Sequence, residues 1–255
     1  LAQAYETRER LLAAHGLPDE AVVIVEMTTT GDKRIELKLG EIGGKGLFTK
    51  ELEEALLSGA VDLAVHSMKD VPTVGQDDLM IGAVLEREDP RDTFISVNCD
   101  SIENLPQDAV VGTASLRRRA QLAVIRPDVS FTLLRGNVGT RLEKLRAGEC
   151  DATFLAYAGL KRLGRTDVVT QIIESEMMLN APAQGAIGVE IRKSDTDVKS
   201  LISELNHRPT ELSIISERAF LRALDGSCRT PIAALATFAG KTLNLTGQVL
   251  SLDGT

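Results

Sequence analysis

Short apolar runs alternate with helical patterns along most of this chain, an order typical of α/β proteins with mostly parallel strands. Runs rich in Val, Ile and Leu predict the strands, and apolar positions three and four residues apart predict the helices between them. The predicted strands cover residues 22–27, 62–65, 79–85, 110–112, 130–134, 152–155, 186–192, 231–238 and 242–250. The predicted helices cover residues 1–14, 50–57, 116–126, 138–147, 156–163, 195–205 and 211–224.

Two changes in this rhythm predict domain boundaries. The polar segment 86–91 separates two α/β stretches, so we expect the chain to cross between domains there. After Gly226 two strands follow one another directly, which predicts a small last domain that we expect to continue past Thr255. The chain begins with Leu1 rather than Met, and we expect its true start to lie upstream.

The composition fits a globular protein with an uneven charge. The chain has 255 residues, 43% of them hydrophobic, which is enough for packed cores and excludes a disordered or fibrous protein. A formal net charge of -8 argues against a nucleic-acid partner. Residues 113–165 nevertheless contain eleven Lys and Arg against four Asp and Glu, so we expect this stretch to bind anions.

The cysteines and histidines predict no metal centre. Cys99, Cys150 and Cys228 are widely spaced and odd in number, which supports neither a disulfide framework nor a zinc site and indicates a reducing compartment. The three histidines are scattered along the chain. No apolar run reaches the length of a membrane span, so we expect no membrane partner.

The segment 112–119 runs from a predicted strand directly into a predicted helix and carries groups suited to anions. Its helix offers free N–H groups at the turn, and the hydroxyls of Thr113 and Ser115 add donors. The guanidiniums of Arg117 and Arg118 supply forked charged donors, so the turn predicts a carboxylate or phosphate site.

Two later strand ends repeat this design. The turn 135–141 places Arg135 and Arg141 around two glycines, and Lys161 and Arg162 follow a third strand. Any single arginine is equally well explained as part of a solvated surface. Basic groups at three successive strand ends favour an anion-binding cleft, because ligands bind at the carboxyl ends of parallel strands.

Three further candidates each leave an alternative open. The glycine-rich loop 40–46 fails the nucleotide-binding pattern and is expected either to present Lys45 from a mobile loop or to be a surface turn. Asp70 follows a strand and is expected either to stabilise a developing cation or to pair with Lys69. Cys228 lies in a turn beside an arginine, which favours an exposed thiolate over the alternative of a buried, inert thiol.

Six strings of the chain resemble those of the porphobilinogen deaminase family, also called hydroxymethylbilane synthases, and they occur in the same order. They are GGKGLF at 43–48, HSMKDVP at 66–72, EDPRD at 88–92, SLRR at 115–118, LRGNVGTR at 134–141 and GSC at 226–228. The family's N-terminal Thr-Arg-x-Ser stretch is absent here, and its frequent Gly-Gly-Cys is Gly-Ser-Cys.

The resemblance implies an α/β fold with two domains that resemble type II periplasmic-binding proteins and face each other across a cleft. A small α/β third domain carries the cysteine. We expect the first domain to comprise residues 1–87 and 186–204, the second 91–180 and the third 208–255.

The resemblance also implies the reaction. The family condenses four porphobilinogen molecules, with loss of four ammonia, into the linear tetrapyrrole hydroxymethylbilane. Growth takes place on a dipyrromethane cofactor, which the match places on Cys228 through a thioether. A monomeric cytoplasmic enzyme that hands its product to uroporphyrinogen III synthase is implied, with plastid import left open.

The resemblance assigns roles residue by residue, and Asp70 matches the catalytic aspartate. The implied cofactor contacts are Lys69, Asp70, Thr113, Ser115, Arg117, Arg118 and Arg141. The implied substrate contacts are Gln3, Lys45, Arg135, Arg141 and Arg162. Gln184 and Arg218 lie in matching segments without an assigned role.

A second hypothesis comes from another class of protein. A type II solute-binding protein for a small polycarboxylate would share both the expected fold and an arginine-lined cleft. The Cys228 loop, the Asp70 segment and the third domain favour the enzyme.

Overall fold

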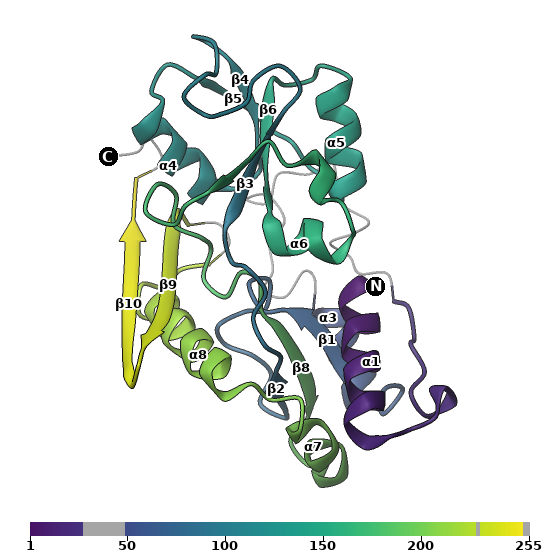
Figure 1. Cartoon of the computed structure of the whole chain (residues 1–255). Coiled ribbons are helices and arrows are strands. Elements are labelled where there is room, and N and C mark those ends of the chain that lie inside the picture. The colour runs from purple at the N-terminus through teal and green to yellow at the C-terminus, as the bar shows by residue number, and fades with distance from the viewer. Residues whose placement is uncertain (28–48, 228–229, 252–255) are drawn as a thin grey trace.

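The computed structural model describes residues 1–27, 49–227 and 230–251, and its strands form three separate sheets (Figure 1). The strands are β1 (Ala64–Ser67), β2 (Leu79–Val84), β3 (Asp92–Ser96), β4 (Val110–Gly112), β5 (Ser130–Thr132), β6 (Ala152–Ala156), β7 (Gln171–Ile173), β8 (Ile187–Arg192), β9 (Ile232–Ala239) and β10 (Thr242–Val249). The three-stranded sheet has the order β1-β8-β2, and the five-stranded sheet has the order β5-β4-β6-β3-β7. The third sheet is the hairpin of β9 and β10.

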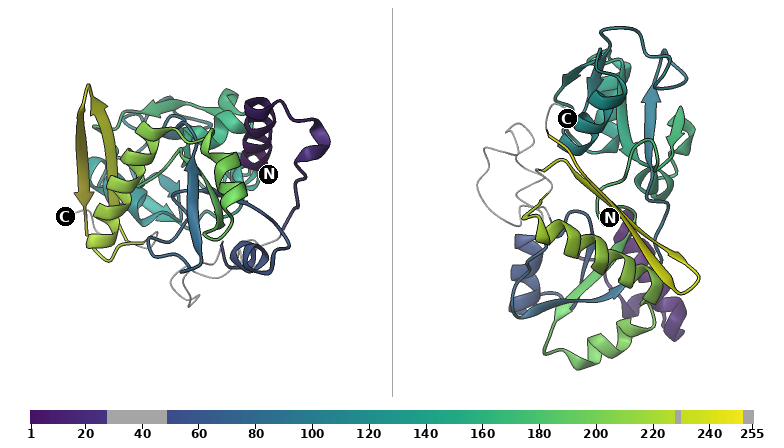
Figure 2. Two further views of the ribbon diagram at one scale, coloured as in Figure 1. Left: turned by 90° about the horizontal axis from the view of Figure 1, so that it is seen from below. Right: turned by 90° about the vertical axis from the view of Figure 1, so that its left-hand side faces the viewer.

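Helices alternate with the strands of both larger sheets, which confirms the predicted α/β class. They are α1 (Ala2–His15), α3 (Lys50–Ser58), α4 (Leu116–Ile125), α5 (Val138–Arg146), α6 (Tyr157–Arg162), α7 (Thr196–Ser203) and α8 (Arg208–Ala223), with short 3₁₀ turns at Asp19–Ala21 and Thr166–Val168. The α4, α5 and α6 helices accompany the five-stranded sheet, while α1, α3 and α7 accompany the three-stranded one (Figure 1). The α8 helix contacts β2 as well as both strands of the hairpin (Figure 2).

The expectation of mostly parallel strands is wrong for the strands described. Parallel pairing is confined there to β4 with β5 and β4 with β6. The other pairs are antiparallel. β3 and β8 are each the first strand that the chain enters after crossing between the larger sheets, and both run antiparallel to every strand with which they pair.

The chain crosses between the two larger sheets at 85–91 and at 174–186, and these two segments contact each other. The N–H of Glu88 donates to the carbonyl of Gly185 at 3.3 Å. Gly185 has φ +90°, and a side chain at this position would collide with the Glu88 carbonyl oxygen. Glycine therefore serves both the backbone conformation and the close approach.

Each of the larger sheets has its own apolar core. In the five-stranded sheet, Phe94 and Phe154 are fully buried with ring centroids 5.8 Å apart. In the three-stranded sheet, Val189 and Ile191 of β8 are fully buried beneath α1 and α7 residues such as Leu11 and Ile202. Because each sheet has its own apolar core, the polar groups that lie between the two sheets are outside both cores.

The strand pattern differs from the prediction at three places. Residues 22–27 form no strand, because Val23 and Val25 remain 77% and 54% exposed and pair with no described strand. The β3 and β7 strands were not expected. The α3 helix, predicted at 50–57, spans Lys50–Ser58.

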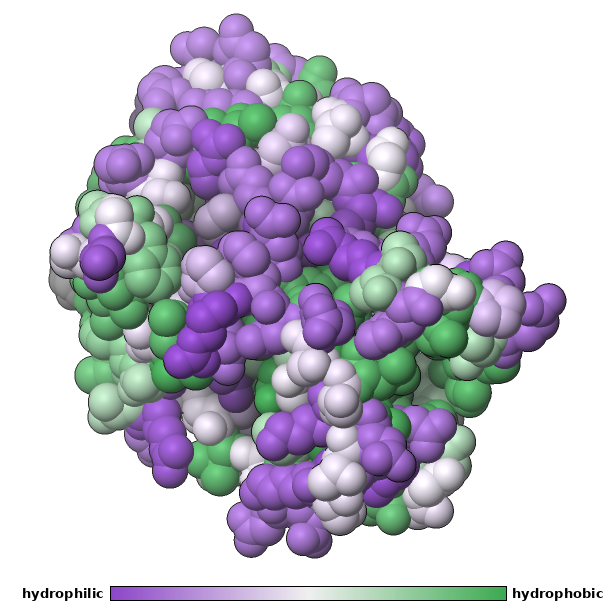
Figure 3. All heavy atoms as spheres, turned by 60° about the horizontal axis from the view of Figure 1, so that its bottom comes forward, coloured by the Kyte–Doolittle hydropathy of each residue, from purple (hydrophilic) through white to green (hydrophobic). Residues whose placement is uncertain are grey.

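The surface is mostly hydrophilic on the face shown in Figure 3, with apolar side chains gathered over the β9–β10 hairpin at its left edge. Phe238, Leu245 and Val249 of this hairpin are 40–56% exposed. None of the helices within the described ranges is both long and apolar enough to cross a membrane.

Candidate active site

A buried carboxylate, Asp92, lies at the centre of the polar region between the sheets. It is the first residue of β3 and is completely shielded from solvent. Its Oδ2 accepts from Arg117 at 2.7 Å, and its Oδ1 accepts from Arg118 at 2.7 Å and from Gln184 at 2.8 Å. One carboxylate therefore binds two guanidiniums and one amide.

The start of α4 places both arginines at this carboxylate. The Ser115 Oγ accepts from the Arg118 N–H at 3.4 Å and caps the helix, so both arginines lie in its first turn. Their remaining terminal nitrogens donate to the carbonyls of Leu179 and Phe154, each at 2.7 Å. The Nε atoms of Arg117 and Arg118 are buried and have no hydrogen-bond partner within the described ranges.

The buried charges of Asp92, Arg117 and Arg118 stabilise one another. Burial alone would raise the pKa of the Asp92 carboxyl, but Arg117 and Arg118 outweigh it and hold that pKa far below its usual range. Burial lowers the pKa of Arg117, and Asp92 opposes this effect. Two buried cations share one anion, so the group retains an excess positive charge.

The turn after β1 brings Lys69 and Asp70 to this group. The Asp70 N–H donates to the Ser67 carbonyl at 2.9 Å and shapes the turn. The Lys69 ammonium donates to the Gln184 Oε1 at 3.4 Å. Burial lowers the pKa of Lys69, Asp70 opposes this, and Arg118 adds to it.

Gln184 connects the two sides of the site. Its amide oxygen accepts from Lys69, while its Nε2 donates to the Pro90 carbonyl at 2.7 Å and to Asp92. Gln184 lies on one of the segments that cross between the sheets, and Pro90 lies on the other. Its amide thereby joins the Lys69–Asp70 turn to the Asp92 group.

Arg141 and Arg135 extend the positive charge from the start of α5. The Arg141 Nε donates to the Gly136 carbonyl at 2.7 Å, and Gly136 adopts φ +116°. Burial and Arg118 lower the pKa of Arg141 to about 10, with Asp70 opposing and Arg135 contributing further. Arg117, Arg118, Arg135 and Arg141 are called the arginine cluster below.

Arg162 lies at the end of α6 and is already paired. Its Nε donates to Glu6 on α1 at 2.8 Å, and its NH2 donates to the Gly185 carbonyl at 3.0 Å. Gln3 lies on the same helix as Glu6, three residues earlier, and is half-buried. This ion pair joins a helix beside the three-stranded sheet to a helix beside the five-stranded one.

The hydroxyls expected to contact the cofactor also serve the backbone. The Thr113 Oγ1 accepts from the Ser115 N–H at 3.1 Å, and Ser115 caps α4. Each hydroxyl oxygen accepts in these bonds, so its proton remains available for donation to a ligand. Lys45 and Cys228 lie outside the described residues.

Sequence reasoning did not assign Asp92 or Glu6 to the site. Asp92 closes the string EDPRD, and this match was the one available signal. A lone aspartate at the start of a strand gives no sign that it is buried. Glu6 looks like an ordinary polar residue of an amphipathic helix, and its partner is 156 residues away in the sequence.

We expect Asp92→Asn to lower the free energy of unfolding by about 3–5 kcal/mol, because it leaves two buried guanidiniums without their counter-ion. Urea denaturation measures this change. Asp167→Asn is the matched control, since the exposed Asp167 pairs with Arg165 at 3.4 Å and the expected loss is below about 1 kcal/mol. Equal losses for the two variants would contradict the assignment.

The Asp92 stabilisation also predicts a pH dependence. Its folded-state pKa lies below the unfolded value of about 3.9. The stabilisation is therefore complete at neutral pH and is lost only as the pH falls towards the folded-state pKa.

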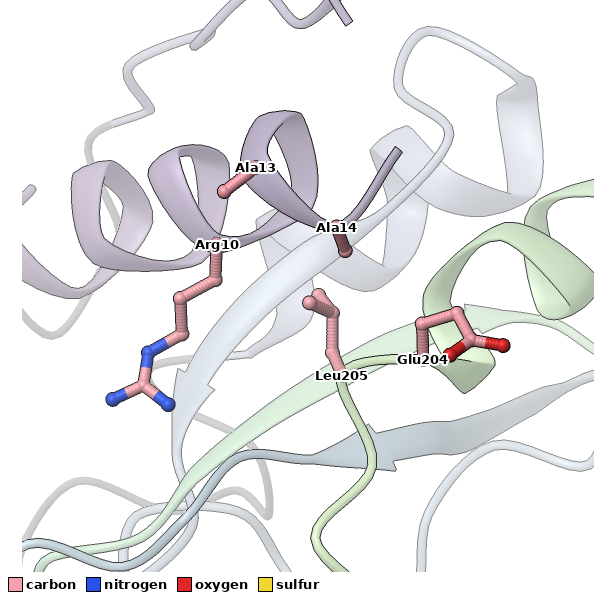
Figure 4. Close-up of a pocket in the computed structure, with 5 residues that line it drawn as sticks. All are labelled: Arg10, Ala13, Ala14, Glu204 and Leu205. Atoms are coloured by element: carbon pink, nitrogen blue, oxygen red, sulfur yellow. The ribbon is translucent and has the colours of Figure 1, made fainter. Parts of the chain in front are cut away.

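Among the described residues, the surface beside α1 carries no buried group of charges like that of Asp92. A shallow hollow between α1 and the residues after α7 is lined by Arg10, Ala13, Ala14, Glu204 and Leu205 (Figure 4). Arg10 pairs there with Glu6 at 2.9 Å, and Glu204 extends in another direction. In the part of the chain that the structure describes, no three His, Cys, Asp or Glu residues gather as a metal site would require.

Two family models match the chain. One is described as porphobilinogen deaminase, dipyrromethane cofactor binding domain, and matches residues 1–200. The other, the porphobilinogen deaminase C-terminal domain, matches residues 212–255.

Curated relatives and solved structures also resemble the chain. A porphobilinogen deaminase of Paracoccus denitrificans is 54% identical over 254 residues, which cover 100% of this chain and 81% of the relative. One of Nitrobacter hamburgensis is 49% identical over 255 residues, with the same coverage. A periplasmic substrate-binding protein of Coxiella burnetii superimposes with a TM-score of 0.48 at 14% identity, covering 86% of this chain and 92% of that one.

Proposed function

Because this chain belongs to the porphobilinogen deaminase family, we propose that the arginine cluster and the turn of Lys69 and Asp70 form its catalytic centre. The family makes hydroxymethylbilane from porphobilinogen on a dipyrromethane cofactor, in tetrapyrrole biosynthesis. The proposal rests on one observation. The buried, positively charged group of Asp92, Arg117 and Arg118 lies next to the turn that carries Lys69 and Asp70, and Gln184 donates to Asp92 and accepts from Lys69. A solute-binding protein is disfavoured, since both family models belong to the enzyme.

The residues present fit a dipyrromethane. Each pyrrole bears an acetate and a propionate, so the cofactor is a small polyanion. The buried Nε atoms of Arg117 and Arg118 have no hydrogen-bond partner among the described residues. The described bond of Arg141 to Gly136 uses its Nε and not its two terminal nitrogens. When bound, dipyrromethane would supply the pyrrole carbon to which the first unit is joined.

We assign the anion-binding roles by position. Arg117, Arg118 and Arg141 hold carboxylates of the cofactor, with the hydroxyls of Thr113 and Ser115 as further donors. Arg135, Arg141 and Arg162 hold the incoming porphobilinogen, together with Gln3 and Lys45. Substrate carboxylates would compete with Glu6 for Arg162, since both are carboxylates and the guanidinium already binds one.

Asp70 acts on charge that develops during condensation. Loss of ammonia from porphobilinogen leaves an electron-poor pyrrole, and attack by the chain's terminal ring places positive charge on that ring too. A carboxylate fixed beside the pyrrole N–H groups stabilises both. Lys69 lies beside Asp70 in the same turn, and Asp70 opposes the lowering of the Lys69 pKa by burial.

Arg141→Met tests the anion-binding role more cleanly than Arg118→Leu, because Arg118 also neutralises Asp92. We expect the KM for porphobilinogen to rise about 10–100-fold, as expected when a charge-assisted hydrogen bond is lost. Steady-state kinetics with the loaded enzyme measures it. Arg146→Met, on the exposed end of α5, should leave KM within about twofold, and a matching rise there would contradict the proposal.

We also propose the domain ranges 1–87 with 186–204, 91–180 and 208–255, the first two of the type II periplasmic-binding kind. Membership of the three sheets supports them, since β1, β2 and β8 share one sheet, β3 to β7 another and the hairpin the third. Cys228 is proposed as the thioether anchor on its match to the family motif.

We further propose a cytoplasmic monomer that hands hydroxymethylbilane to uroporphyrinogen III synthase. The resemblance to the family supports a monomer. Light scattering of the purified enzyme tests this state, and an obligate dimer would contradict it.

A further inference from the structure

Arg218 on α8 binds the backbone of the turn that carries Lys69 and Asp70. Its NH1 donates to the Met68 carbonyl at 3.3 Å and to the Val71 carbonyl at 2.8 Å. Its NH2 donates to the Pro72 carbonyl at 2.6 Å. The three acceptors lie on both sides of Asp70, so one guanidinium holds the entry and the exit of the turn.

The turn has few other backbone anchors. The Met68 N–H donates to Ala186 and the Asp70 N–H donates to Ser67, while Pro72 has no N–H to donate. Beyond residue 73 the chain is exposed as far as β2. Arg218 therefore supplies the described hydrogen bonds that fix the exit of the turn, where Val71 also packs against the apolar cluster of Met68 and Ile214.

The helix that presents Arg218 is itself held firmly. The neighbouring Glu217 is fully buried, and its carboxylate accepts from Arg87 at 2.6 Å and from the N–H groups of Ala183 and Ala236 at 2.6 and 2.8 Å. One turn earlier, Ile214 packs against Met68 in a shared apolar cluster. Because α8 is fixed in this way, Arg218 gives the turn a rigid reference.

The chemistry of Arg218 suits positioning. Its three described bonds all go to carbonyl oxygens. Burial lowers the pKa of Arg218, and Glu190, which pairs with His66 at 3.0 Å, opposes this effect. A planar fork can reach three carbonyls at once, whereas a lysine ammonium is a point donor on a flexible stem.

We propose that Arg218 is a positioning residue for the condensation, and that it fixes the direction of the Asp70 carboxylate through the backbone of residues 68–72. The inference rests on the proposed role of Asp70. Displacement of a reacting group by about 1 Å costs about 100-fold in rate, so a loosened turn should lower kcat more than it changes KM.

The test compares Arg218→Met and Arg218→Lys in the full-length, cofactor-loaded enzyme. We expect kcat per loaded chain to fall about 10–100-fold in the methionine variant and less in the lysine variant, with KM within about threefold. Amide hydrogen exchange of residues 67–71 should become faster in both. Arg222→Met, one turn further on the same helix and exposed, should change none of these.

The outcomes separate this inference from the role of Asp70. Normal kcat in Arg218→Lys together with unchanged exchange would overturn the inference, as would faster exchange with normal kcat. If Arg218→Met fails to fold, the lysine variant still decides the question. Full activity of Asp70→Asn would instead overturn the role of Asp70, whatever the exchange of the turn shows.

Discussion

Cys228→Ser is expected to yield a chain without bound cofactor and with turnover reduced by more than about 1,000-fold. A serine hydroxyl is not ionised at neutral pH and is a far weaker nucleophile than a thiolate, so the thioether cannot form. Well-oriented intramolecular groups reach effective concentrations of about 10⁵–10⁸ M, and this advantage of a tethered primer is lost with the tether. Intact-mass measurement should show the wild-type chain heavier by two condensed pyrrole units and the variant unmodified.

The control for this experiment is Cys99→Ser. Cys99 lies beside the core of the five-stranded sheet, away from the arginine cluster, and its replacement should leave both the added mass and turnover unchanged. A wild-type chain isolated without added mass from cells that make porphobilinogen would contradict the covalent-primer mechanism.

Asp70→Asn is expected to lower turnover about 100–1,000-fold, the loss typical when one preorganised stabilising group is removed. Asparagine is nearly isosteric with aspartate, so the turn should keep its shape while the negative charge disappears. Ammonia release from porphobilinogen measures the effect in single-turnover experiments with the loaded enzyme.

Asp77→Asn provides the control, because Asp77 is an exposed aspartate of the same connection between β1 and β2. It should keep wild-type ammonia release. Near-normal release by Asp70→Asn would remove this carboxylate from the mechanism. An unloaded Asp70→Asn chain would instead place its role in assembly of the cofactor, so the added mass is measured on the same sample.

Much of the fold could be predicted because it depends on local patterns. The α4 helix, predicted at 116–126, spans Leu116–Ile125, and α5 begins at the predicted residue Val138. Both have caps that the sequence shows directly, Ser115 and Asn137. An apolar stripe next to a capping residue is enough to define such helices.

The remaining elements depend on partners that are distant in the sequence. The β3 strand begins with Asp92 and Thr93, both fully buried, but two polar residues in a row look like a loop. The apolar run at 22–27 has the opposite problem, because its pattern predicts a strand but no described strand pairs with it. Strand formation is decided by the neighbouring strand as much as by the residue types.

The site shows the same division. Charge counting found the arginines, and the position after a strand found Lys69 and Asp70. The sequence could not show that Asp92 forms ion pairs with Arg117 and Arg118, or that Glu6 forms one with Arg162. Ion pairs between distant residues leave no local pattern. The predicted anion-binding groups are therefore partly neutralised by the protein itself.

The two adjoining crossings at 85–91 and 174–186 have a mechanical consequence for a growing product. Two bodies joined by two neighbouring tethers move most easily by rotation about an axis near those tethers. Asp92 follows the first tether and Gln184 belongs to the second, so the anion-binding group lies beside the axis, where displacement is smallest. In such a rotation Asp92 and Gln184 would keep their contact, while residues far from the two crossings would move most.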